Sequence, residues 1–372
     1  MSRYIVHDFL QVAGGAERLV LDLALAFPDY ALVVSRVYPE ARLLLPRGGL
    51  EVRTLGTASS RVLGRILEAI VRFRRSTDFL ADAETVLYSG FYAPFAVANQ
   101  RHGRRVYYCH APPRFAYEMR AFYLERMAAP ARPLANRFFD YVRTSYEASL
   151  RRMDVLVANS RNVQARLRRI LGAEATVVHP PIDTRRFRWI EPGDYFVSLA
   201  RLTEYKRVEL IVRAFLRMPD RRLVVASTGP QEGHLRRLAA GAANISFTGL
   251  LAEERLSDLV GRSRAAIYVP IDEDFGMSPV EAMAAGKPVI GVAEGGLLET
   301  VVEGETGFLV PAPPSVESLA EAVGRLTAER ALAMRDACEA RARRFSKAIF
   351  LERMGAILEG APEMLYDSAR LA

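Results

Sequence analysis

Residues 268–290 read YVPIDEDFGMSPVEAMAAGKPVI, and this stretch decides the expected fold. Short apolar runs rich in β-branched residues, 265–269 and 288–292, flank a helical segment that is too short to be more than a crossover. A strand, a helix and a second strand in this order form a βαβ unit, which requires a parallel sheet. The sequence therefore predicts an α/β protein.

The crossover helix carries its own start and stop signals. Ser278 suits the N-cap, Pro279 the first helical position and Glu281 the third, while Gly286 supplies a left-handed stop. The first backbone amides of this helix then face the crevice beyond the carboxyl ends of the strands, where open α/β sheets bind ligands. An anion or a cluster of polar hydroxyls suits this position.

Two glutamates, Glu273 and Glu281, bracket the loop before the helix with seven residues between them. Glu281 also has a purely structural interpretation as a capping-box acid, and Glu273 one as a solvated loop acid. The whole stretch resembles the signature of the retaining glycosyltransferases of family 4. The resemblance implies that Glu273 holds sugar hydroxyls and Glu281 the donor ribose, with further donor contacts from Phe275, Gly276 and Met277.

The resemblance also implies the GT-B fold, an α/β architecture of two doubly wound Rossmann-like domains facing each other across a cleft. A length of 372 residues agrees with two domains of similar size, because it exceeds one ordinary core. We expect an N-terminal acceptor-side domain at 1–187 and a nucleotide-sugar-binding domain at 188–345. Residues 346–372 should form a helix that crosses back to the first domain, followed by a tail.

Composition bounds the class of protein. The formal net charge is +8, nearly all from arginine, which favours anionic partners such as phosphorylated substrates or membrane headgroups. No nucleic-acid-binding module is recognisable. We expect no transmembrane helix and no signal peptide, and two isolated thiols, Cys109 and Cys338, suggest a reducing compartment. The expected location is cytoplasmic, including the inner face of the cell membrane.

The first half alternates strands and helices, as in a doubly wound domain. Gly14 and Gly15 form a glycine turn between the first strand and a helix expected from Arg18, and the family has such a pair facing the donor. His110 ends a strand at the carboxyl edge, where family members have a histidine that contacts sugar or acceptor. Residues 114–152 interleave arginine with aromatics, which fits either an anionic membrane surface or a solvated arginine face over a buried aromatic core.

The second half supplies the cations. Arg201 and Lys206 follow a strand end, and the family has an arginine and a lysine at this spacing on the donor diphosphate. Fixed cations stabilise a leaving diphosphate without a metal. Arg207 departs from the family's commoner glycine, and Tyr205-Lys206-Arg207 resembles members that use GDP-mannose. The resemblance adds donor contacts from turns at Gly229, Thr248, Gly249 and Leu250.

The sequence thus predicts a metal-independent retaining hexosyltransferase whose chemistry depends on Glu273, His110, Arg201 and Lys206. GDP-mannose and UDP-hexoses both stay open as donors, and the acceptor is expected to be a glycan or a lipid-linked saccharide. Retention by front-face attack is implied by the family alone, so Glu273 is not assigned as a nucleophile. Two alternatives stay open: a nucleotide-sugar epimerase on the same architecture, and a non-catalytic basic binder of membrane or nucleic acid.

Overall fold

The protein is described by a computed structural model that covers residues 2–11, 14–45, 50–59 and 62–360. The chain divides into two compact units. The first contains residues up to His179 and those from Leu351 onward, and the second runs from Pro180 to Phe350. The first limit lies eight residues before the boundary expected at 187, and the second lies five residues after the one expected at 345. The described part of the chain from Leu351 belongs to the first unit.

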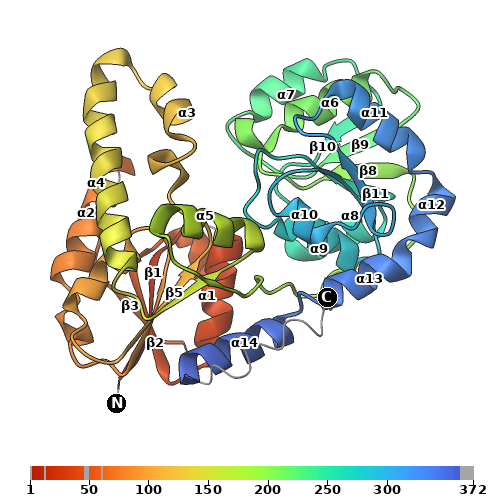
Figure 1. Ribbon diagram of the computed structural model, residues 1–372. Helices are drawn as coiled ribbons and strands as arrows, with labels where there is room; N and C mark the ends of the chain where they lie inside the picture. Colours follow the sequence, from red (N-terminus) through yellow and green to blue (C-terminus); the bar gives the residue numbers. More distant parts are fainter. Residues whose placement is uncertain (1, 12–13, 46–49, 60–61, 361–372) are drawn as a thin grey trace. The chain divides into compact units, whose positions relative to one another are not determined.

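The first unit is built on a parallel sheet, seven-stranded within the described residues, in the order β3-β2-β1-β4-β5-β6-β7. Helices flank both of its faces (Figure 1). The strands are β1 (Arg3–Leu10), β2 (Tyr30–Val37), β3 (Val52–Thr54), β4 (Thr85–Ser89), β5 (Arg104–Cys109), β6 (Val155–Ala158) and β7 (Thr176–Val177). The main helices are α1 (Gly15–Ala26), α2 (Val62–Arg75), η3 (Ala93–Asn99), α3 (Arg120–Glu125), α4 (Arg132–Leu150) and α5 (Arg161–Leu171).

The second unit repeats this plan with a parallel sheet, six-stranded in the part of the chain that the structure describes, in the order β10-β9-β8-β11-β12-β13. The strands are β8 (Tyr195–Ser198), β9 (Arg222–Val225), β10 (Ile245–Phe247), β11 (Ala265–Tyr268), β12 (Val289–Val292) and β13 (Gly307–Val310). The helices are η6 (Glu204–Lys206), α6 (Val208–Leu216), α7 (Glu232–Leu238), α8 (Glu253–Gly261), α9 (Met277–Ala284), α10 (Leu297–Thr300), α11 (Val316–Arg325), α12 (Ala328–Ala333), α13 (Arg335–Arg343) and α14 (Lys347–Glu359), which ends in the first unit.

Each unit has its own apolar core. Strands β4, β11 and β12 are buried along their whole length, which is why their sequences are continuous apolar runs rather than alternating ones. In each sheet the strand order changes direction beside the strand that comes first in sequence, β1 in the first sheet and β8 in the second. Doubly wound folds bind ligands at the carboxyl ends of the strands next to this point. The predicted pair of doubly wound Rossmann-like domains is confirmed.

Two predicted helix starts are wrong. Helix α9 begins at Met277 with Gly276 as its N-cap, so Ser278 does not cap it and Glu281 is its fifth residue rather than its third. The reason is the left-handed conformation of Gly276 (φ 92°), which turns the chain into the helix two residues early. Helix α1 likewise begins at Gly15 rather than Arg18. The predicted stop at Gly286, with φ 66°, is confirmed.

Candidate functional site

Four loops meet at the carboxyl edge of the second sheet, and backbone hydrogen bonds join them. The Ile271 amide donates to the Tyr205 carbonyl at 2.8 Å, which ties the loop after β11 to the loop after β8. The loop after β12 is joined through the Gly296 amide, which donates to the Glu273 carbonyl at 2.7 Å. The Leu202 amide donates to the Thr228 carbonyl at 3.0 Å, which joins the loop after β9 to the loop after β8. The loops that carry Arg201, Lys206, Gly229 and Glu273 are therefore joined to one another at this edge.

Lys206 and Glu273, which are 67 residues apart in sequence, form the central ion pair of these loops. The Lys206 ammonium donates to the Glu273 carboxylate at 2.5 Å and to the Tyr268 hydroxyl at 2.8 Å. Both charged side chains are only about 15% exposed. Burial by itself would lower the pKa of Lys206, but the contacts with Tyr268 and Glu273 outweigh it and raise the pKa above its ordinary value. Lys206 is therefore a fixed cation at neutral pH.

Glycines bring these loops close together. A Cβ added to Gly229 would lie 2.5 Å from the Leu202 carbonyl oxygen, so only glycine lets the turn after β9 pack on the backbone beside Arg201. A Cβ on Gly296 would lie 2.5 Å from the Cα of Phe275. These close approaches hold the loop that carries Glu273 against its neighbours.

The predicted donor residues at the start of α9 differ in what they expose. The Phe275 ring is buried and packs against Phe345, with centroids 5.3 Å apart, so any donor contact of Phe275 must come from its backbone. Met277 is half-buried and packs against the core, while Glu281 is half-buried on the second turn. Because Gly276 is the N-cap, the capping-box interpretation of Glu281 is wrong.

The remaining predicted residues of the second unit are more exposed. Arg201 follows β8 with an exposed side chain, and Thr248 and Leu250 are exposed in the turn after β10. Gly249 in this turn has φ 70°, and a Cβ there would lie 4.0 Å from the Thr228 methyl group. The turns after β9 and β10 are therefore neighbours at the carboxyl edge.

The sequence did not predict the ion pair between Arg207, the residue after Lys206, and Glu294. Arg207 adopts a left-handed conformation (φ 51°) that is unusual for a residue with a side chain. Its guanidinium donates to the Pro270 carbonyl at 3.3 Å and to the Glu294 carboxylate at 2.5 Å. The departure from glycine at position 207 was the available signal, but nothing in the sequence pointed to Glu294.

In the first unit, Gly14 is the N-cap of α1 and Gly15 its first residue, while His110 directly follows β5. The Ser89 hydroxyl lies 2.7 Å from Nε2 of His110. Burial, with a smaller contribution from His7, lowers the pKa of His110 to about 3, so the ring is neutral at physiological pH.

Asp8 is a second feature of this edge that sequence reasoning missed. Its buried carboxylate accepts hydrogen bonds from the amides of Phe91, Tyr92 and Ala93 at 2.6, 2.8 and 2.7 Å. Burial raises the pKa of Asp8 to about 6, although the three amide donors oppose the shift. The carboxylate satisfies the free amides at the start of η3, which is a structural role.

The aromatic and arginine side chains of residues 114–152 mostly pack against and hydrogen-bond to one another. Phe115 and Phe139 pack together with ring centroids 5.1 Å apart. Arg120 donates to Asn136 and, at 2.7 Å, to Asp140. For these residues the structure agrees with a solvated arginine face over packed aromatics. None of the helices in the described residues is both long and apolar enough to cross a bilayer.

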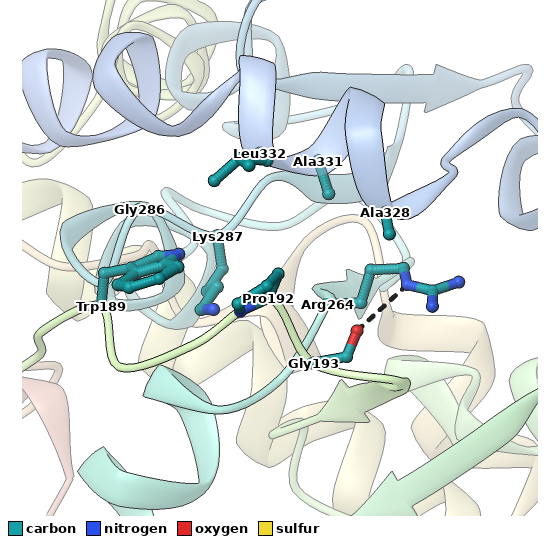
Figure 2. A pocket seen from close by; sticks show the side chains of 9 residues that line it. All are labelled: Trp189, Pro192, Gly193, Arg264, Gly286, Lys287, Ala328, Ala331 and Leu332. Carbon is teal, nitrogen blue, oxygen red and sulfur yellow. Dashed lines mark hydrogen bonds between the residues drawn. The ribbon is translucent and has the colours of Figure 1, made fainter.

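Lys287, the single cationic residue of the stretch 268–290, lies at the opposite edge of the second sheet. It lines a cavity of about 10 Å³, room for about one water molecule, between Trp189 and α12 (Figure 2). Its buried ammonium donates to the Glu191 carbonyl at 2.6 Å and lies 5.2 Å from the Trp189 ring centroid. Burial, and then the charge of Arg335, lower the pKa of Lys287 to about 8. Lys287 therefore stabilises the fold rather than the candidate site.

Two family models match the chain in succession. The model described as Glycosyltransferase Family 4 matches residues 13–186, and the one described as Glycosyl transferases group 1 matches residues 182–345. Together they span both units.

Curated relatives are glycosyltransferases. A GDP-mannose-dependent alpha-(1-6)-phosphatidylinositol monomannoside mannosyltransferase of Mycolicibacterium smegmatis is 33% identical over 212 residues, which cover 49% of this chain and 55% of the relative. An alpha-1,3/1,6-mannosyltransferase of Dictyostelium discoideum is 26% identical over 380 aligned positions, covering 87% of this chain and 88% of the relative. The chain spans about half the length of the first curated relatives it matches.

Solved structures share the fold. Sucrose-phosphate synthase from Thermosynechococcus elongatus superposes with a TM-score of 0.77 at 19% identity, covering 96% of this chain and 98% of the other. An Anabaena protein, HepE, solved in complex with UDP and glucose, superposes with a TM-score of 0.75 at 16% identity, covering 96% and 99%. At these identities the likeness shows the architecture alone.

Proposed function

Since this chain belongs to glycosyltransferase family 4 and has the GT-B fold, we propose that it transfers a hexose from a nucleotide diphosphate sugar to a glycan or lipid-linked acceptor. In this proposal the reaction is metal-independent and retains the α configuration of the donor. The observation that carries the proposal is the partly buried Lys206–Glu273 ion pair among the loops at the carboxyl edge of the second sheet.

The leaving group explains why a fixed cation is needed. A nucleoside diphosphate gains negative charge as the glycosidic bond breaks, and a pre-positioned donor stabilises that charge without reorganisation. An ammonium has three N–H donors, and the contacts with Tyr268 and Glu273 use two of them. The third would bind the diphosphate. Arg201 and the first amides of α9 would add positive charge and further donors on the same edge.

The acids of the signature would bind the uncharged parts of the donor. Glu273 would accept hydrogen bonds from sugar hydroxyls while its carboxylate also accepts one from Lys206. Glu281 would accept from the ribose hydroxyls. Gly14, Gly15 and His110 would bind sugar or acceptor from the first unit, as the family resemblance implies.

GDP-mannose is the donor we propose. A relative that matches 87% of this chain is a mannosyltransferase, and a shorter match is to a GDP-mannose-dependent enzyme. The UDP of the Anabaena complex makes UDP-hexoses the competing choice. The test is a thermal-shift panel of GDP, UDP and ADP with their sugars, in which GDP and GDP-mannose should give the largest shifts.

A matched pair of variants tests the site itself. Lys206→Met keeps the apolar stem and should abolish the shift from the preferred nucleotide. Arg222→Ala removes the same charge from an exposed ion pair with Asp194 at the start of β9 and should leave the shift intact. An unchanged shift in the Lys206 variant would remove the basis of the proposal. Conversion of the nucleotide sugar without any acceptor would instead support the epimerase alternative.

We also propose that the first unit makes peripheral contact with an anionic membrane, through α2 rather than through residues 114–152. Leu63, Leu67 and Val71 recur every four residues along α2 and are 55, 45 and 50% exposed. The exposed Arg74 and Arg75 end this apolar stripe. An apolar stripe beside arginines fits the interface of an anionic bilayer.

Vesicle binding tests the membrane contact. The protein should co-sediment with vesicles that contain anionic lipid and not with purely zwitterionic ones. Leu67→Glu should weaken this binding, whereas Leu332→Glu, at an exposed leucine on α12 of the second unit, should not. Equal binding by both variants would exclude α2 as the contact.

A further inference from the structure

Three polar side chains, His7, Ser89 and His110, form a chain of contacts at the carboxyl edge of the first sheet. Nδ1 of His7 lies 3.1 Å from the Ser89 hydroxyl and 3.2 Å from the Ser89 carbonyl oxygen. The same hydroxyl lies 2.7 Å from Nε2 of His110. His7 and Ser89 are buried, and the chain has only five histidines in all.

The sheet register explains why these side chains meet. His7 on β1 pairs with Ser89 on β4, and Ser89 pairs with Tyr108 on β5. Paired residues of neighbouring strands point to the same face, and so does a residue two positions further along the chain. His110 therefore returns to the face of Ser89 and His7, where its ring packs edge-on to Tyr108 at a centroid distance of 5.1 Å.

The carbonyl of Ser89 fixes the direction of the hydrogen bonds. A carbonyl oxygen only accepts, so the contact with His7 requires the proton of that ring on Nδ1. The same N–H then faces the Ser89 hydroxyl oxygen, which accepts from it. The hydroxyl is left to donate its own proton to Nε2 of His110. Nε2 is thus the acceptor nitrogen of the neutral His110 ring, and Nδ1 carries the proton.

We propose that His7 and Ser89 are positioning residues that hold His110 in its Nδ1–H tautomer, so that His110 serves as a hydrogen-bond donor to a hydroxyl oxygen of the sugar or acceptor. The identity of that substrate rests on the proposed function, but the tautomer does not. Within the described residues, Nδ1 of His110 has no hydrogen-bond partner, which leaves this donor for a ligand.

Further contacts fix the position and charge of His110. The side-chain amide of Asn159 donates to the His110 carbonyl at 2.6 Å, which holds the backbone at the end of β5. Burial lowers the pKa of His7 to about 4 and that of His110 to about 3, so both rings stay neutral at physiological pH. A neutral ring whose Nε2 already accepts from Ser89 is a poor general base. The arrangement assigns His110 to substrate orientation instead of proton abstraction.

Nuclear magnetic resonance of protein labelled with nitrogen-15 at histidine tests the tautomer directly, without substrate. At pH 7.5 long-range proton–nitrogen spectra should show a protonated Nδ1 and an unprotonated Nε2 for His110, assigned by the loss of its signals in His110→Asn. Ser89→Ala should shift the tautomer mixture of His110 toward Nε2–H. A protonated Nε2 in the wild-type protein would overturn the proposal, whatever the enzyme's activity.

Two substitutions of His7 distinguish a role in donating a hydrogen bond to Ser89 from a role in filling space. His7→Asn keeps an N–H near the Nδ1 position, whereas His7→Gln carries its amide near the Nε2 position and leaves Ser89 without its donor. Once thermal unfolding shows both variants folded at the assay temperature, kcat/KM should fall about tenfold or more in the Gln variant and be largely kept in the Asn variant. Equal losses in both, with the His110 tautomer unchanged in both, would reduce His7 to a packing residue and overturn its positioning role.

Discussion

Two replacements of Arg207 should separate the energetic cost of its left-handed backbone from the stabilisation that its ion pair provides. A non-glycine residue in the left-handed region costs roughly 1–2 kcal/mol. Arg207 adopts this conformation (φ 51°) while its guanidinium binds Glu294 and the Pro270 carbonyl. Glycine at this position would relieve the strain and lose both contacts, whereas alanine would keep the strain and lose both contacts.

The size of the effect follows from the burial of the pair. The side chains of Arg207 and Glu294 are 20 and 23% exposed, so their interaction should lie between the worth of a surface pair, about 0–1 kcal/mol, and the cost of breaking a buried one, about 3–5 kcal/mol. We expect Arg207→Ala to lower the free energy of unfolding by about 2 kcal/mol, and Arg207→Gly by about 1 kcal/mol less.

Urea and thermal unfolding measure both effects. For a unit of this size 1 kcal/mol corresponds to about 2–4 °C in Tm. The donor KM should rise in both variants, because the ion pair holds the loops that carry Lys206 and Glu273. Equal unfolding midpoints for the glycine and alanine variants would refute the strain. A full additional loss from Glu294→Gln in the Arg207→Ala background would refute the ion pair.

The remaining predictions concern Lys287 and the buried groups of the first unit. Lys287→Met should lower the free energy of unfolding by about 1–3 kcal/mol, because the Glu191 carbonyl loses its donor, and should leave the donor thermal shift unchanged, since the residue lies at the opposite edge of the sheet. Acid should destabilise the first unit: the neutral rings of His7 and His110 contribute stability that is complete above their ordinary pKa of 6.5 and is lost as the pH falls toward about 4 and about 3. Asp8 has the opposite effect: its pKa is raised from 3.8 to about 6, so the first unit gains stability from Asp8 as the pH falls between these two values. This gain from one group is smaller than the loss from the two histidines. Unfolding followed from pH 8 to pH 4.5 should therefore show a net loss of about 3 kcal/mol, and a flat profile would contradict the burial of the two rings.

The central strands, such as β11 and β12, could be predicted because they are buried on both faces. A strand covered by helices on both sides is a continuous apolar run, and glycine, proline and polar residues mark its ends. The apolar runs 265–269 and 288–292 were predicted as strands, and β11 and β12 each differ from them by one residue at one end. Once the sheet is parallel and doubly wound, its carboxyl edge gathers the loops that carry Lys206 and Glu273, which explains why their proximity could be anticipated.

The partners of the predicted residues could not be anticipated in the same way. Tyr268 contacts Lys206 from the end of another strand, and Glu294 reaches Arg207 across 87 residues of sequence. His7 and Ser89 meet through strand register, which no local pattern in the sequence specifies. A sequence motif identifies residues that face a ligand, whereas the residues that hold them depend on side-chain packing between distant elements.

The residue that caps α9 decides whether Glu281 has a local structural role. Had Ser278 been the N-cap, Glu281 would have had a local structural reason to be an acid. With Gly276 as the cap, that reason disappears, and the acid is the fifth residue of an eight-residue helix whose other neighbours, such as Val280 and Met283, are buried apolar side chains. Glu281 is half-buried on the second turn, beside the loop that carries Glu273. This is the position from which the proposed function has Glu281 bind the donor ribose.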